Sequence, residues 1–350
     1  MSLESKGVTV VSDGVSHTFK GTISFIAADN LGSHGMGGFM ESFTSSRICR
    51  SCMCTYKSLK EPQLSLNFRE RTIDGHRHQL GMIKQHPNLS SVYGVKSNCP
   101  FNKLCYFHVI KGLPFDPTHD LLESVCPLVW SKVLTSLVER KHLTVTQMNS
   151  KLQSFPFTGS DKSSKPTHVS WSSGRVVIKQ NASQMWCFCR LAPVMFGGSV
   201  PKEDKIWDPV LQLNDVLNLS FAPRQNYQMV AYLNGLIEDF LHYFLMIFPD
   251  DGLTPKMHYL LHYSRQIEQF GPATNCSTIR FEAKHSYFKD LARKTKNRKN
   301  LAKTLAQRHQ NLMSYYSCSE MWSGIDHITS TGFQVEDVNM FCPKIRDVLY

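Results

Sequence analysis

The sequence lacks a hydrophobic run long enough to cross a membrane. Its longest apolar stretch, residues 240–248 (FLHYFLMIF), has about half the length that a membrane helix needs. The first residues, MSLESKGVTVVSDG, lack both the basic and the apolar part of a signal peptide. We therefore expect no membrane partner and a reducing compartment, where neighbouring cysteines suggest metal binding before disulfides.

Acidic residues are also scarce. The 28 Asp and Glu residues face 39 Lys and Arg residues, which gives a formal charge of +11 and a pI near 9.1. This balance favours a polyanionic partner such as nucleic acid, although many basic proteins bind none. The 11 cysteines are odd in number and irregularly spaced, so they form no regular disulfide framework. We find no internal repeat, and 350 residues suffice for one large domain or two.

The N-terminal segment is rich in β-branched and aromatic residues. We expect strands at residues 8–11, 16–20 and 22–28, with a turn at residues 12–14 between the first two. The third strand ends on Asp29, and α/β folds place chemistry at the carboxyl end of a buried strand. The alternative for Asp29 is a helix N-cap or a turn. The glycines that follow lack the spacing of a nucleotide-binding loop.

The middle of the chain is mostly helical by its pattern. Residues 76–96 are polar and irregular, and residues 160–173 form the best candidate for an exposed loop. His119 and Asp120 offer catalytic groups, but capping and packing are the simpler roles. Apolar residues at helical spacing predict helices over 117–125 continuing through 128–138, over 144–152, over 186–193 and over 226–248.

Two separate motifs offer metal ligands. Cys49 and Cys52 form a C-x-x-C pair that binds zinc, performs redox chemistry or does neither. His258 and His262 are four residues apart, so one helix would present both imidazoles on one face. Each pair supplies half of the four ligands of a structural zinc site. Together they predict a Cys2His2 site built from distant parts of the chain.

The chain becomes strongly basic after Glu282. Residues 284–308 form one helix, or two broken near Asn297, with apolar residues on one side and cations on the other. Because the charge is nearly all of one sign, it favours a phosphate-binding face, and it could also serve as a nuclear localisation signal. The alternative interpretation is a charged face that only contacts solvent. Nine cations oppose Asp290: Lys284, Lys289, Arg293, Lys294, Lys296, Arg298, Lys299, Lys303 and Arg308.

The order of these features resembles DDE transposases of the CACTA (EnSpm)-like superfamily, which share their layout with the V(D)J recombinase catalytic subunit. The resemblance covers residues 8–310 and includes the phrases DNLGSHGMGGF, GLPFDPTHDLLESV, PKMHYLLHY and RFEAKHSYFK. It implies an α/β fold with dominant α content, in which an RNase H-like core is interrupted by a large helical insertion. The implied segments are 1–60 and 251–316 for the core, 61–250 for the insertion and 317–350 for a tail.

The resemblance also implies roles for the residues. Asp29 matches the second catalytic acid and Glu282 the third, and these acids would hold Mg²⁺ or Mn²⁺. Cys49, Cys52, His258 and His262 match the ligands of a structural Zn²⁺, which would join the Asp29 region to the Glu282 helix. DNA is the implied partner, bound without sequence preference through the basic residues. A nuclear location is also implied. The resemblance leaves open whether the chain forms a homodimer.

One feature of the family pattern is missing. The first acid lies on an earlier strand in the family, but the sole aspartate before Asp29 is Asp13, in a predicted turn. We expect a truncated core that neither cleaves DNA nor transfers strands on its own. An upstream exon and a decayed gene copy both stay open as explanations. The alternative function is a co-opted zinc-stabilised module that binds DNA or protein without catalysis.

Overall fold

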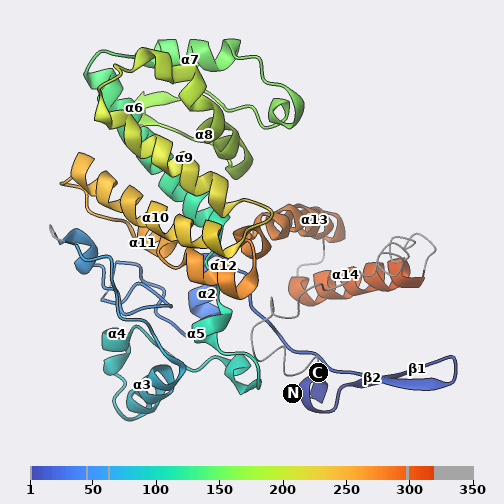
Figure 1. Ribbon diagram of the computed structural model, residues 1–350. Coiled ribbons are helices and arrows are strands. Elements are labelled where there is room, and N and C mark those ends of the chain that lie inside the picture. The colour runs from blue at the N-terminus through green and yellow to red at the C-terminus, as the bar shows by residue number, and fades with distance from the viewer. Residues whose placement is uncertain (1, 45, 62–63, 297–298, 319–350) are drawn as a thin grey trace. The chain divides into compact units, whose positions relative to one another are not determined.

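The computed structural model describes residues 2–44, 46–61, 64–296 and 299–318, and it divides into two compact units, Met1–Thr278 and Ile279–Tyr350 (Figure 1). The described chain is mostly helical. Its α-helices are α1 Ser2–Ser5, α2 Asn30–Gly37, α3 Ile73–Gln85, α4 Leu89–Tyr93, α5 Val109–Gly112, α6 Cys126–Glu139, α7 Val145–Ser154, α8 Ala182–Phe196, α9 Asp208–Ser220, α10 Tyr227–Ile247, α11 Pro255–Leu260, α12 Tyr263–Phe270, α13 Ile279–Thr295 and α14 Leu301–Cys318.

The remaining elements are short. A π-helix, η3, spans Thr118–Val125 and runs directly into α6. Single 3₁₀ turns occur at Ser58–Lys60, Pro100–Lys103, Gly159–Lys162, Gly197–Ser199, Lys205–Trp207 and Ala273–Cys276. The strands are β1 Val8–Ser12, β2 Val15–Phe19, β3 Ser170–Ser172 and β4 Arg175–Val177.

The described strands form two antiparallel hairpins, β1–β2 and β3–β4. The first matches the sequence prediction, with Val8 opposite Phe19 and a turn at Asp13 and Gly14, both at positive φ. The predicted strand over residues 22–28 is wrong. This segment lacks a strand neighbour, because Ile23 and Ile26 pack instead against a small hydrophobic core. β-branched residues fit a strand only where a partner strand exists.

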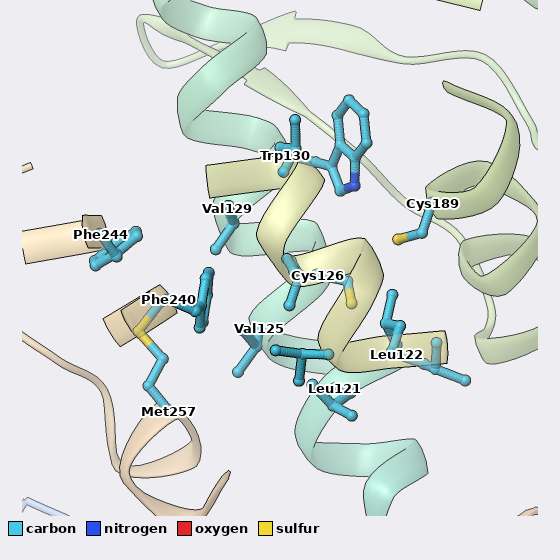
Figure 2. Close-up of a cluster of buried hydrophobic side chains, with 14 of the residues drawn as sticks. Leu121, Leu122, Val125, Cys126, Val129, Trp130, Cys189, Phe240, Phe244 and Met257 are labelled. Atoms are coloured by element: carbon cyan, nitrogen blue, oxygen red, sulfur yellow. The ribbon is translucent and has the colours of Figure 1, made fainter. Parts of the chain in front are cut away.

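The main hydrophobic core surrounds the continuous helix η3–α6 (Figure 2). Trp130 of α6 lies edge-on between Phe188 of α8 and Trp207, with ring centroids 5.2 and 5.4 Å apart. Phe240 and Phe244 of α10 belong to the same cluster, and all of these side chains except Trp207 are at most 1% exposed. The helical spacing of apolar residues in the sequence therefore reports core packing.

Most predicted helices in this unit are confirmed. α7 begins with a capping box between Thr144 and Gln147, and α10 begins with Asn226 as its N-cap. α8 extends past Pro193 to Phe196, three residues beyond the predicted end. The predicted loop at residues 160–173 is largely exposed and leads into the β3–β4 hairpin.

A second, smaller core is formed by residues 39–113 and includes Phe39, Val95 and Leu113. The prediction of irregular structure at residues 76–96 is wrong, because α3 and α4 occupy most of this segment. Two glycines and many polar residues hide the helical pattern of α3, whose Ile73, Leu80 and Ile83 face this core.

The second unit contains a helical hairpin of α13 and α14. Leu291, Leu301 and Leu305 are half-buried. α13 ends at Thr295 and α14 begins at Leu301, so of the two predicted alternatives, one helix or two, the structure has two. The rings of Tyr287 and Phe288 contact His309 across the seam. Most of the predicted tail lies outside the described residues. The four-segment division of the chain stays a prediction.

One helix in the described part of the chain is long and apolar enough to cross a membrane, Thr118–Glu139. Half of its most apolar window is buried inside the unit, where it forms the core shown in Figure 2. The core helices of globular proteins share this length and composition.

Candidate metal centre

The two cysteines lie in a loop without regular secondary structure that follows α2. A short antiparallel bridge holds this loop, with Met53 N–H donating to Arg69 O at 2.8 Å and Arg71 N–H donating to Ser51 O at 2.9 Å. The side chain of Arg71 donates to the carbonyls of both Cys49 and Cys52, at 3.0 and 3.2 Å. The bridge and this guanidinium together fix the backbone of the C-x-x-C motif.

The two histidines come from the junction of two helices. His258 belongs to α11, which starts with Thr254 as its N-cap, and His262 is the N-cap residue of α12. The prediction that one continuous helix carries both rings is wrong. At the junction the backbone tightens to i→i+3 hydrogen bonds, from Leu261 N–H to His258 O and from His262 N–H to Tyr259 O. Both rings nevertheless point to the same place.

The four side chains converge, and their ligand atoms all lie within 4.8 Å of one another. Cys49 Sγ is 3.3 Å from His262 Nε2, Cys52 Sγ is 3.1 Å from His258 Nε2, and the two Nε2 atoms are 3.4 Å apart. Neighbouring ligands of a tetrahedral zinc ion lie roughly 3.3–3.8 Å apart. The cluster therefore has the size and the ligand chemistry to hold a metal ion such as zinc.

Burial isolates the cluster from water. Cys49, Cys52 and His258 are at most 2% exposed, and His262 is 9% exposed. The ring of Phe115 stacks on His262 at 5.3 Å, and that of Phe68 contacts His258 edge-on at 4.7 Å. Burying polar side chains this completely is costly unless they form hydrogen bonds with one another or bind an ion. An ion bound here would have a dry, closed site, which is typical of structural metals.

The protonation of the cluster follows from its crowding. Burial raises the pKa of the Cys49 thiol, but the thiol of Cys52 and the imidazole of His262 outweigh burial and hold that pKa well below its usual value. Burial and the Cys49 neighbour raise the pKa of Cys52 well above normal. Without a metal, the pair thus favours one thiolate. A bound zinc ion requires two, so binding releases protons.

The surroundings stabilise the thiolate. Ser51 N–H donates to Cys49 Sγ at 3.3 Å. Burial lowers the pKa of Arg71 below its usual value, although Cys49 and Cys52 act in the opposite direction. Arg50, between the two cysteines, is 1% exposed and stacks on Phe115 with 3.8 Å between Cζ and the ring centroid. Neither arginine could be assigned a role from the sequence, because Arg50 is one of the two residues between the cysteines and Arg71 lies 19 residues after Cys52.

The two acids matched to catalysis belong to different units, Asp29 to the first and Glu282 to the second. Asp29 is exposed and caps α2, accepting a hydrogen bond from Gly32 N–H at 2.6 Å. The prediction that a buried strand ends on Asp29 is wrong, whereas the alternative of an N-cap is confirmed. Glu282 lies in α13 of the second unit, and its side chain lies outside the described residues. A shared Mg²⁺ or Mn²⁺ site therefore stays a prediction.

The predicted DNA-binding cations lie on α13, α14 and the segment between them. All are exposed except Arg298, which lies outside the described residues. Asp290 pairs with Arg293 at 3.1 Å, and Lys284 lies 4.7 Å from the ring of Tyr287. The unit thus presents a strongly cationic surface. Surface pairs such as that of Asp290 and Arg293 contribute little energy and leave most of the charge available.

No model of a protein family matches the chain, and no curated protein matches it. The geometry of the metal centre and the charge of the second unit are therefore the observations that bear on function.

Proposed function

We propose that this chain is a transposon-derived protein related to DDE transposases. In this proposal it carries part of an RNase H-like core, a structural zinc centre and a DNA-binding surface on α13 and α14. It acts in the nucleus and binds DNA without sequence preference. The chain alone neither cleaves DNA nor transfers strands, because it offers two of the three acids that this chemistry uses.

A single observation supports the proposal most strongly. Two thiols and two imidazoles separated by 206 and 213 residues meet in one buried cluster. Residues that are far apart in the sequence often meet in a compact domain. A buried cluster made of four metal-binding side chains is much less expected by chance. It is also the ligand set that the resemblance implies for these positions.

A bound zinc ion would supply cross-linking rather than catalysis. The apparent binding energy of structural zinc is about 10–16 kcal/mol, which is comparable to the whole net stability of a typical domain. Four protein ligands leave no open position for a substrate or an activated water. Cys49 and Cys52 would hold the loop after α2, and His258 and His262 would hold the junction of α11 and α12.

The acids support the expected lack of activity. Asp13, the sole aspartate before Asp29, lies in the exposed turn of β1–β2 at φ 52°. A two-metal site needs carboxylates that converge, and a turn at the tip of an isolated hairpin is a poor place for one. If the purified chain nicked plasmid DNA with Mg²⁺ or Mn²⁺, and Glu282→Ala abolished the nicking, the proposed inactivity would be wrong.

The zinc centre is tested by metal analysis of the purified chain. We expect close to one zinc per chain, lost in the double variant Cys49→Ser, Cys52→Ser. The matched control is Cys187→Ser, a buried cysteine of α8 outside the cluster, which should keep its zinc. Chelation should also lower the thermal midpoint of the wild type but not of the double variant. A wild-type chain that is fully folded without metal and binds none would refute the proposal.

A second candidate function is supported by the β1–β2 hairpin. One of its faces carries Val8, Val10, Val15 and Phe19, which are 47–60% exposed, together with Ser12 and His17. The opposite face is mainly polar, with Val11 as its apolar residue. The apolar face of an antiparallel sheet is normally packed against other parts of the protein or against a partner. This observation favours the alternative of a zinc-stabilised module that binds protein, with a second copy of the chain as one such partner.

A further inference from the structure

Arg50 makes three hydrogen bonds from a buried position beside a metal ligand. Its Nε donates to Leu113 O at 3.0 Å, its Nη2 to Pro114 O at 2.7 Å, and its Nη1 to Asn30 Oδ1 at 2.8 Å. A buried guanidinium is costly unless its fork of donors is satisfied. These partners satisfy all three nitrogens.

Asn30 connects Arg50 to two further features. It is the first residue of α2, directly after Asp29, and it is 6% exposed. Its Nδ2 donates to Asp120 Oδ1 at 2.6 Å, and Asp120 belongs to the central helix η3. The side-chain amide of Asn30 therefore links the buried cation to a buried carboxyl, and its backbone continues into the Asp29 cap.

The other side of Arg50 leads back to the metal centre. Phe115 lies against the Arg50 guanidinium and stacks on the ring of His262. Gln266 of α12 holds Phe115 by two hydrogen bonds, accepting from its N–H at 2.7 Å and donating to its carbonyl at 2.8 Å. Arg50 thus contacts the centre twice, through the peptide bond to Cys49 and through Phe115 to His262.

We propose that Arg50 is a positioning residue that couples occupancy of the metal centre to the Asp29 turn. A metal ion would fix Cys49 and Cys52, which fixes the backbone of Arg50 between them. The guanidinium then holds Asn30, and Asn30 holds the first turn of α2 with its Asp29 cap. The inference depends on the proposed metal centre, but it requires neither DNA binding nor catalysis.

Hydrogen exchange tests this coupling. In the wild-type chain, removing Zn²⁺ with a chelator should accelerate exchange of the amides near the start of α2 about tenfold or more, because their anchor is released. Arg50→Met keeps an unbranched stem but no donors. This variant should still bind one zinc per chain, while its α2 amides exchange fast with and without chelator.

Two further variants separate coupling from general damage. Asn30→Ala leaves the bonds of Arg50 to Leu113 and Pro114 in place and should also abolish the response of α2 to chelator. Arg77→Met removes an exposed arginine of α3, whose side chain is 69% exposed, and should behave as the wild type. The amides of α10, in the main core, report on global unfolding in every variant.

The outcomes distinguish this inference from the proposed function. If Arg50→Met binds zinc and its α2 amides respond to chelator as in the wild type, Arg50 does not couple the two sites. The same conclusion follows if the zinc-loaded wild type shows no response at α2. A wild-type chain that binds no zinc overturns the proposed function, and this inference with it.

Discussion

Asp120 is a carboxylic acid with no exposed surface in the interior of the first unit. Burial raises its pKa from 3.8 to about 7, although Asn30 and Arg50 act in the opposite direction. The side-chain amide of Asn30 lies between the two groups, donating to the Asp120 carboxyl and accepting from the Arg50 guanidinium. The sequence singled out Asp120 beside His119 and assigned nothing to Arg50. It could not show the connection between Asp120 and Arg50, because Asn30 is 90 residues from Asp120.

The raised pKa of Asp120 predicts a pH-dependent effect on stability. A folded-state pKa near 7 means that the folded protein holds this proton more tightly than the unfolded chain does. The contribution of Asp120 to stability is therefore lost as pH rises from about 4 to 7. Asp120→Asn keeps an acceptor for Asn30 and never ionises. Its free energy of unfolding should therefore rise relative to that of the wild type by up to about 4 kcal/mol over this pH range.

Urea unfolding of both proteins at pH 5 and pH 8 should show about 3 kcal/mol of this difference, because part of it has already developed at pH 5. Comparing the two proteins at each pH cancels the titration of the histidines, which affects both equally. A free-energy difference that stays constant between the two pH values would contradict the buried, shifted carboxyl.

At the scale of elements, apolar periodicity identified α10 and the η3–α6 helix, because these helices bury one stripe of side chains against a large core. The same reasoning failed for α3, whose buried side is short. Composition failed for residues 22–28, where β-branched residues predicted a strand but pack as an extended segment without a strand neighbour. Local propensity predicts an element well only when tertiary partners agree with it.

The η3–α6 helix gives a prediction on core packing. Trp130 is 1% exposed between two aromatic rings, so Trp130→Ala should lower the free energy of unfolding by about 3–5 kcal/mol. Trp171 in the β3–β4 hairpin is 45% exposed, and Trp171→Ala is the matched control, with an expected change within about 0.5 kcal/mol. Denaturant unfolding compares them. Equal losses in the two variants would show that α6 is not the centre of the core.

At the scale of the whole molecule, the charge is concentrated in the second unit. Residues 284–308 hold nine of the 39 Lys and Arg residues, and one acid. The sequence predicted this surface and all four residues of the metal cluster, because ligand types and charge can be read directly. It could not predict which loops and helix ends bring the four together, since that depends on the packing of some 200 intervening residues.

The cationic surface gives a prediction on DNA binding. If about six of its cations contact phosphates, the logarithm of the binding constant should fall with the logarithm of salt at a slope near −5. Lys289→Glu with Lys294→Glu should weaken binding and reduce the slope by about one per lost contact. Lys202→Glu, an exposed position in the first unit, is the control. A slope near zero in the wild type would remove DNA from the proposal.

The separation of the metal ligands has a consequence for biosynthesis. Cys49 precedes His262 by 213 residues, so at typical translation speeds roughly 10–40 s pass before the ribosome has made the imidazole. During that time the nascent chain carries two unprotected thiols. The four-ligand centre would therefore form only after nearly the whole first unit has been synthesised. A prematurely terminated chain would keep both thiols without the histidines that complete the site.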